Sequence, residues 1–268
     1  MTKSLLQQVM LKGENRKKAE VHPIDPQGLV KAIEAGYVAS RGTKFQTKKT
    51  FAPSTLAYSH GECPRYWYIA FEGADFEDNS DAHGVANMTS GTLSHGRIQT
   101  AMKDAGILID DEFKVTYADP PIFGYGDVLL NWQGEELLGE IKTMMNEAFE
   151  YRKAAGKPKT GHLIQLLIYM KILKKRNAIF IYENKNNHEL LVLPVEVNDY
   201  YVRWVDQAFE WMREVRKAWM NKTLPIKHYR SNSKICKTCP VQKACASAGE
   251  GTIKLSPLEP LNEDLPMV

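Results

Sequence analysis

The 268-residue sequence lacks any long uninterrupted run of apolar residues. An apolar stretch at residues 163–173 is interrupted by Gln165 and Lys171, so no segment has the pattern of a membrane-spanning helix or a signal peptide. We therefore expect a cytoplasmic protein with no membrane partner. Because 43% of the residues are hydrophobic, the chain can bury a substantial core.

Cysteine is scarce, and neither sign of charge is in clear excess. The four cysteines are not expected to form disulfides in a reducing cytoplasm, so they need another explanation. The 35 Lys and Arg against 32 Asp and Glu give a net charge of +3, which is too small to indicate nucleic-acid binding by itself. Basic residues do collect at 12–18, 44–49 and 171–176, whereas 72–81 is acidic.

Composition divides the chain into three parts. Residues 1–53 are polar and basic and predict a loosely packed arm with a short helix near Pro26–Ala35. Residues 54–248 predict one folded core, and the acidic, Pro-containing residues 249–268 a flexible tail. Its last residues, 262–268, place acidic side chains before an apolar end, a pattern that could dock on a protein partner. No internal repeat occurs.

Hydrophobic periodicity within the core predicts helices and strands in alternation. A helix capped by Thr89 or Ser90 is expected to end at Gly106, which can adopt a left-handed conformation. A turn at Gln133-Gly134 predicts a hairpin. The other expected helices are Tyr66–Phe71, Thr160–Leu173 and Tyr200–Met220, and the expected strands are Glu112–Thr116, Gly126–Trp132, Glu136–Thr143, Ala178–Tyr182 and Leu190–Val197.

Two carboxylates and one amine are predicted to converge in this region. Glu140 and Lys142 stand two apart in an apolar strand, so they project from the same face, and Asp127 lies on the neighbouring strand. Charges in a half-buried sheet are costly unless they bind something. Oxygen ligands of this kind suit Mg²⁺ or Mn²⁺, and the ammonium can orient a water. The alternative to a metal site is a surface ion pair between Glu140 and Lys142.

The cysteines form a second candidate site. Cys236, Cys239 and Cys245 have the spacing C-x2-C-x5-C, and Cys63 lies far upstream. Four thiolates could complete a tetrahedral zinc site, which the spacing alone favours slightly, or hold a cubane iron–sulfur cluster. Either group would tie the C-terminal segment to the start of the core, so its loss should destabilise the whole domain.

Six short motifs follow one another along the chain: Cys63-Pro64-Arg65, Gly91-x3-His95, Gly124-x2-Asp127, Glu140-Ile141-Lys142, Gln165-x3-Tyr169 and the cysteine trio. In this order they resemble the RecB-like branch of the PD-(D/E)xK nucleases. More narrowly, the chain resembles the iron–sulfur exonucleases of the CRISPR-associated and AddB type, including phage-encoded relatives. The resemblance implies an α/β fold with a mixed, restriction-endonuclease-like sheet flanked by helices and a cysteine-clasped subdomain. Gly126 stands where the family name has a proline.

The resemblance also implies a role for each motif residue. Asp127, Glu140 and Lys142 would be catalytic, and His95, Asp127, Glu140 and the carbonyl of Ile141 would bind Mg²⁺ or Mn²⁺. Cys63, Cys236, Cys239 and Cys245 would hold a four-iron four-sulfur cluster, with zinc as the alternative. The remaining motif residues, Gln165, Tyr169 and Arg65, would support the site or contact DNA, although a buried polar pair and packing beside the cluster are the alternatives.

The resulting expectation is a metal-dependent DNA exonuclease in a bacterial or phage-infected cell. It would hydrolyse phosphodiester bonds at single-stranded DNA ends during recombination, DNA processing or CRISPR adaptation. Two alternatives stay open at this point. One is a nucleic-acid-binding module of a recombination complex with weak or no cleavage, and the other is a zinc-stapled interaction protein.

Overall fold

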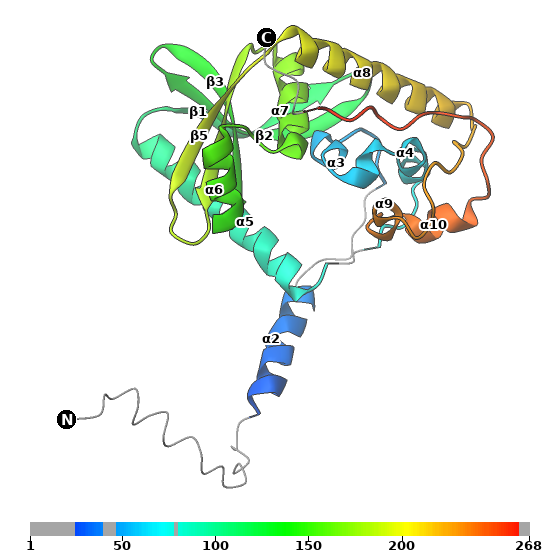
Figure 1. The fold of residues 1–268 in the computed structure, drawn as a ribbon, viewed down its shortest axis with the longest axis horizontal. Helices are drawn as coiled ribbons and strands as arrows, with labels where there is room; N and C mark the ends of the chain where they lie inside the picture. The colour runs from blue at the N-terminus through cyan, green and yellow to red at the C-terminus, as the bar shows by residue number, and fades with distance from the viewer. Residues whose placement is uncertain (1–24, 40–46, 78–79, 263–268) are drawn as a thin grey trace.

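A mixed five-stranded sheet forms the centre of the protein (Figure 1). The computed structural model describes residues 25–39, 47–77 and 80–262. Neighbouring strands are antiparallel except β3 and β4, which are parallel. The predicted mixed α/β fold is confirmed. In spatial order the strands are β1 (Leu108–Tyr117), β2 (Ile122–Trp132), β3 (Glu135–Met144), β4 (Asn177–Asn184) and β5 (Leu190–Glu196).

The hairpin between β2 and β3 has the turn that the sequence predicts. Trp132 pairs with Glu135, so Gln133 and Gly134 form a two-residue loop. Their φ angles are 54° and 86°, which match the right-handed twist of the flanking strands. The hairpin sets the register that places Asp127 on one strand near Glu140 on the other.

Helices connect and cover the sheet. The parallel pair β3 and β4 requires a crossover, which α6 and α7 supply. No helix in the described ranges is long and apolar enough to cross a membrane. The helices are α2 (Pro26–Ala39), α3 (Pro53–Leu56), η1 (Ser59–Glu62), α4 (Pro64–Phe71), α5 (Ala82–Asp104), α6 (Asn146–Ala155), α7 (Thr160–Leu173), α8 (Asp199–Met220), α9 (Lys234–Lys237) and α10 (Gln242–Ser247).

Helix α5 begins earlier than its sequence predicts. The predicted cap was Thr89 or Ser90, whereas the observed cap is Asp81, whose Oδ1 accepts a hydrogen bond of 2.7 Å from the Gly84 N–H. An acidic residue at this position satisfies a free backbone donor and favours the helix start. The end agrees with prediction, because Gly106 has a φ of 70°.

The two faces of the sheet pack against different helices. On one face α4, α7 and α8 cover residues such as Leu138 and Phe180, and on the other α5 covers Ile141 and Ile181. Helix α4 is buried along its whole length, so Tyr66, Trp67 and Tyr68 are part of the core.

The predicted domain boundaries change at both ends of the core. Phe51, placed by prediction in the N-terminal arm, is fully buried and forms a bridge with Ile122. Residues 249–262, predicted as flexible, lie along α8, where Trp204 and Trp211 donate indole hydrogen bonds of 3.0 and 2.8 Å to backbone carbonyls of this segment. The packed chain therefore extends to at least residue 262.

Two other predicted features fall outside the described residues. The basic arm before residue 25 and the terminal residues 263–268, expected to dock on a partner, are not described by the structure. The partner site therefore stays a prediction.

We expect Leu258→Ala to destabilise the protein by about 2–3 kcal/mol, because this side chain of the segment after Gly249 is only 5% exposed and its loss leaves a cavity. Urea denaturation followed by circular dichroism measures the effect. Leu93→Ala is the matched control, since Leu93 is 71% exposed. Equal stability of both variants and the wild type would contradict the packed position of this segment.

Candidate active site

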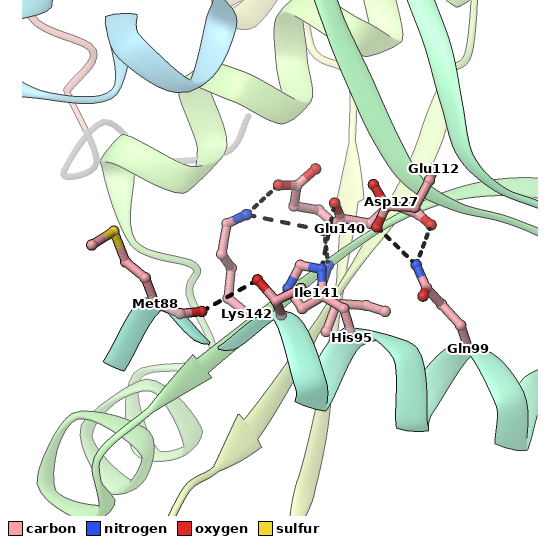
Figure 2. A network of polar contacts seen from close by, with 9 residues as sticks. Met88, His95, Gln99, Glu112, Asp127, Glu140, Ile141 and Lys142 are labelled. Carbon is pink, nitrogen blue, oxygen red and sulfur yellow. Dashed lines mark hydrogen bonds and ion pairs between the residues drawn. The ribbon is translucent and has the colours of Figure 1, made fainter. Parts of the chain in front are cut away.

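Asp127 lies where strands β2 and β3 separate. The last backbone pair between these strands joins Val128 to Gly139. Just past it, the Ile141 N–H donates a hydrogen bond of 2.7 Å to Asp127 Oδ2 (Figure 2). The Asp127 carboxylate thus accepts a hydrogen bond that a backbone carbonyl of a paired strand would otherwise accept. This bond fixes the Asp127 side chain at the opening between the strands.

Glu140 and Lys142 project toward the same opening. The Lys142 ammonium contacts Glu140 Oε1, and its Nζ lies 4.0 Å from Asp127 Oδ2. The structure therefore brings together the three side chains that the sequence selected. Because Glu140 is fully buried, the pair differs from the surface salt bridge considered as the alternative.

His95 approaches Asp127 from helix α5. Its Nδ1 lies 3.8 Å from Asp127 Oδ1, on the other carboxylate oxygen from the one facing Ile141. Glu112 of β1 joins this pair: one ligand atom each of His95, Glu112 and Asp127 all lie within 4.8 Å of one another. The sequence did not single out Glu112, because it lies in an acidic stretch with no motif.

Burial and neighbouring charges determine the protonation of Glu140 and Lys142. Burial, and then repulsion from Asp127, raise the pKa of Glu140 to about 8. Its Oε2 is buried and has no hydrogen-bond partner. Burial alone would lower the pKa of Lys142, but attraction to Glu140 and Asp127 outweighs it and raises the pKa. The ammonium is therefore held in its charged form.

Two glycines of β2 make room for neighbouring side chains. A Cβ at Gly126 would overlap the ring of Phe113, its cross-strand partner. This contact explains why a glycine fits immediately before Asp127. A Cβ at Gly124 would overlap the hydroxyl of Tyr169. Both close contacts position the strand that carries Asp127.

Gln165 and Tyr169 lie together beneath the site. Both are buried on α7, and the Tyr169 hydroxyl is hydrogen-bonded by Gln165 and by the backbone of Tyr125. Burial raises the pKa of Tyr169, with further contributions from Glu140 and Asp127, so the phenol stays protonated beside the carboxylates. The pair can support the site, but its burial excludes direct contact with DNA in this conformation.

A cleft of about 790 Å³ reaches this cluster from outside. Tyr58 is the most exposed aromatic side chain along it, at 64%. No sequence pattern singles out Tyr58, since an isolated tyrosine in a short helical segment is not distinctive. The lining residues are Tyr58, Asn87, Met88, Gly91, Thr92, His95, Gly96, Gln99, Glu112, Asp127, Lys142, Thr143 and Lys185.

The four cysteines line a second cavity of about 560 Å³. Cys63 precedes α4, and the trio lies on and between α9 and α10. Burial raises the pKa of Cys63 to about 11 and that of Cys239 to about 12, and the neighbouring thiols add to both shifts. The structure therefore brings the remote cysteine to the trio.

Arg65 packs beside the cysteines and does not face the cleft. Its Nε donates to Cys245 Sγ at 3.1 Å, and an Nη donates to the carbonyl of Pro225 at 2.7 Å. Only 1% of the residue is exposed, so contact with a DNA phosphate is excluded in this conformation. The observed position agrees with the alternative prediction, in which Arg65 packs beside the cysteines.

We expect Glu140→Gln to stabilise the metal-free protein at pH 8, by an amount that grows as pH rises from 4.5 toward 8. The folded wild type retains a proton on Glu140 up to about pH 8, whereas the unfolded chain releases it near 4.5, so stability falls as pH rises between these values. The neutral amide removes this loss, and the difference should vanish near pH 4.5. Thermal melts in EDTA, with Glu136→Gln as control, measure it; a difference independent of pH would contradict the assignment.

Comparison with known proteins gives a likeness of fold. No protein-family model and no curated protein match the sequence. The structure of LHK-Exo in complex with dAMP is 15% identical and has a TM-score of 0.51, covering 65% of this chain and 91% of LHK-Exo. A second structure of LHK-Exo, described as an alkaline exonuclease from Laribacter hongkongensis, has 14% identity, a TM-score of 0.49 and coverages of 70% and 95%. SSO0001 has 14% identity, a TM-score of 0.44 and coverages of 81% and 96%.

Proposed function

We propose that this protein is a divalent-metal-dependent DNA exonuclease of the PD-(D/E)xK type that hydrolyses phosphodiester bonds at single-stranded ends. The observation that carries the proposal is the convergence of Asp127, Glu140 and Lys142 at the opening between β2 and β3, with His95 facing them (Figure 2). Buried carboxylates beside an ammonium are the groups that metal-assisted phosphodiester hydrolysis requires.

The donor set fits Mg²⁺ or Mn²⁺. Glu140 Oε2 is buried without a partner next to a second carboxylate, and a cation would satisfy it and remove the repulsion. The proposed ligands are His95, Asp127, Glu140 and the carbonyl of Ile141. A divalent ion bound there supplies Lewis-acid stabilisation of phosphate charge and a lowered pKa of bound water.

Lys142 has the clearest role among the side chains of the site. Its charged ammonium lies between the two carboxylates and the cleft, where it can donate a hydrogen bond to the attacking water and stabilise negative charge that develops on the phosphate. Hydrolysis forms a bond from water oxygen to phosphorus and breaks the bond to the leaving sugar oxygen, which takes up a proton. Gln165 and Tyr169 support the site from below.

Three observations support DNA as the substrate. The fold resembles that of LHK-Exo, an alkaline exonuclease whose structure contains dAMP. Lys142 and Lys185 line the cleft and can neutralise backbone phosphates. Tyr58 is exposed at its edge, where a base of a single strand can stack. Recombination, DNA processing or CRISPR adaptation in a bacterial or phage-infected cell is the proposed setting.

Glu140→Ala and Lys142→Ala should each reduce cleavage by about 10³-fold, because each removes a group that acts on the reacting phosphate or its water. Oligonucleotides labelled at either end, digested with Mn²⁺, measure the rate and the direction. Glu136→Ala and Lys175→Ala are matched controls, since this exposed ion pair lies away from the cleft and involves the same residue types. Wild-type rates in both site variants would overturn the proposal.

The same experiment separates an enzyme from a binding module. A module would retain end-labelled single strands in EDTA and show little turnover when Mn²⁺ is restored. The exonuclease should release labelled nucleotides from the wild type only when the metal is present.

We further propose that the four cysteines hold a four-iron four-sulfur cluster. The cavity lined by Cys63, Cys236, Cys239 and Cys245 offers four thiols, and the Arg65 N–H that already donates to Cys245 would stabilise their negative charge. One run of three cysteines with a remote fourth also suits a cluster held by four thiolates.

Cys239→Ser should remove the cluster and lower the melting temperature of the whole domain, because the bound group ties α9 and α10 to the start of α4. Oxygen-free purification followed by iron and zinc analysis, visible absorption and thermal melts tests this. Glu140→Ala should retain full iron content and serves as the control. Colourless wild-type protein that contains zinc would support the zinc-stapled alternative instead.

A further inference from the structure

Glu112 has an unusual backbone conformation within strand β1. Its neighbours Asp111 and Phe113 pair with Val128 and Gly126, so Glu112 lies opposite Asp127, but it makes no backbone pair itself. Its φ is 45°, in the left-handed region that residues with a side chain seldom adopt. Such a conformation costs free energy and persists only where the surrounding structure enforces it.

A buried glutamine holds the Glu112 carboxylate against Asp127. Gln99 Nε2 donates to Glu112 Oε1 at 3.1 Å and to the backbone carbonyl of Asp127 at 3.0 Å. Figure 2 shows Gln99 reaching from α5 to both strands. Since Gln99 is buried, this double contact fixes the position of the exposed Glu112 in the lining of the cleft.

The two oxygens of Asp127 face different groups. Oδ2 accepts from Ile141 and faces Lys142, whereas Oδ1 faces His95. Glu112 lies on the His95 side, where the three ligand atoms are within 4.8 Å of one another. On the Lys142 side, the buried Glu140 Oε2 has no partner. Each side of Asp127 thus offers oxygen or nitrogen atoms that could bind a cation.

We propose that Glu112 is a metal ligand, which with His95 and Asp127 holds a second divalent cation. When both ions are bound, His95 serves this second ion, and Asp127, Glu140 and the carbonyl of Ile141 hold the first. This inference rests on the proposed function in assigning metal binding to the same cleft. Asp127 bridges the two positions. In two-metal sites the pair of ions stabilises both the attacking and the leaving oxygen of an in-line displacement.

Mn²⁺ binding to the full-length, cluster-loaded protein without DNA tests the proposal. Electron paramagnetic resonance of free Mn²⁺ counts the bound ions. The wild type should bind two Mn²⁺ per chain, and Glu112→Gln should bind the second at least about tenfold more weakly. Asp111→Asn, which removes the adjacent exposed carboxylate from the same strand, should bind like the wild type.

Glu112→Gly provides a second variant that is compatible with the backbone. Glycine adopts a φ of 45° without steric cost, so this variant should melt no lower than the wild type in EDTA. It should nevertheless lose the second Mn²⁺. Retained stability together with lost binding identifies a ligand and not a folding element.

Two results would overturn the inference: a single Mn²⁺ per wild-type chain, or unchanged Mn²⁺ affinity in both Glu112 variants. The cleavage assay separates this outcome from failure of the proposed function. If the wild type digests DNA and the Glu112 variants bind two ions, only the second site fails. If the Glu112 variants lose an ion but the wild type digests no DNA, the metal site stands and the nuclease function fails.

Discussion

The hydrogen bond from the Ile141 N–H to Asp127 Oδ2 is the interaction on which the candidate site depends. It occupies the point where β2 and β3 stop pairing, so the sheet opens without leaving this backbone donor unsatisfied. The same bond turns one carboxylate oxygen toward Lys142 and leaves the other facing His95. Without it, the opening between the strands would have no fixed acidic group.

Both candidate sites combine groups that are costly to bury together. Glu140 is a fully buried carboxylate beside Asp127, and Lys142 compensates only one of its oxygens. Four thiols line the second cavity, and the buried Arg65 beside it contacts Cys245 Sγ and the backbone carbonyls of Pro225 and Cys245. Each arrangement becomes favourable when a positively charged metal group is bound, and this shared feature links metal binding to stability.

Local signals in the sequence were sufficient for many elements. The Gln133-Gly134 turn predicted its hairpin, and the boundaries of α7 agree with its apolar pattern, because both depend on neighbouring residues. The start of α5 differs from the prediction, because Asp81, at the end of the acidic stretch 72–81, is the helix cap. The segment after Gly249 was missed for another reason: its order comes from indole hydrogen bonds donated by α8, which no local pattern records.

The sequence by itself determined which residue types could meet, because a strand places Glu140 and Lys142 on one face and the hairpin register brings Asp127 alongside. Only the tertiary structure decided that α5 adds His95 and that the left-handed backbone at Glu112 adds a third carboxylate. It also decided that Arg65 and Tyr169 are buried. The physical reason is that strand periodicity is local, whereas burial and the approach of separate elements depend on the packing of the whole chain.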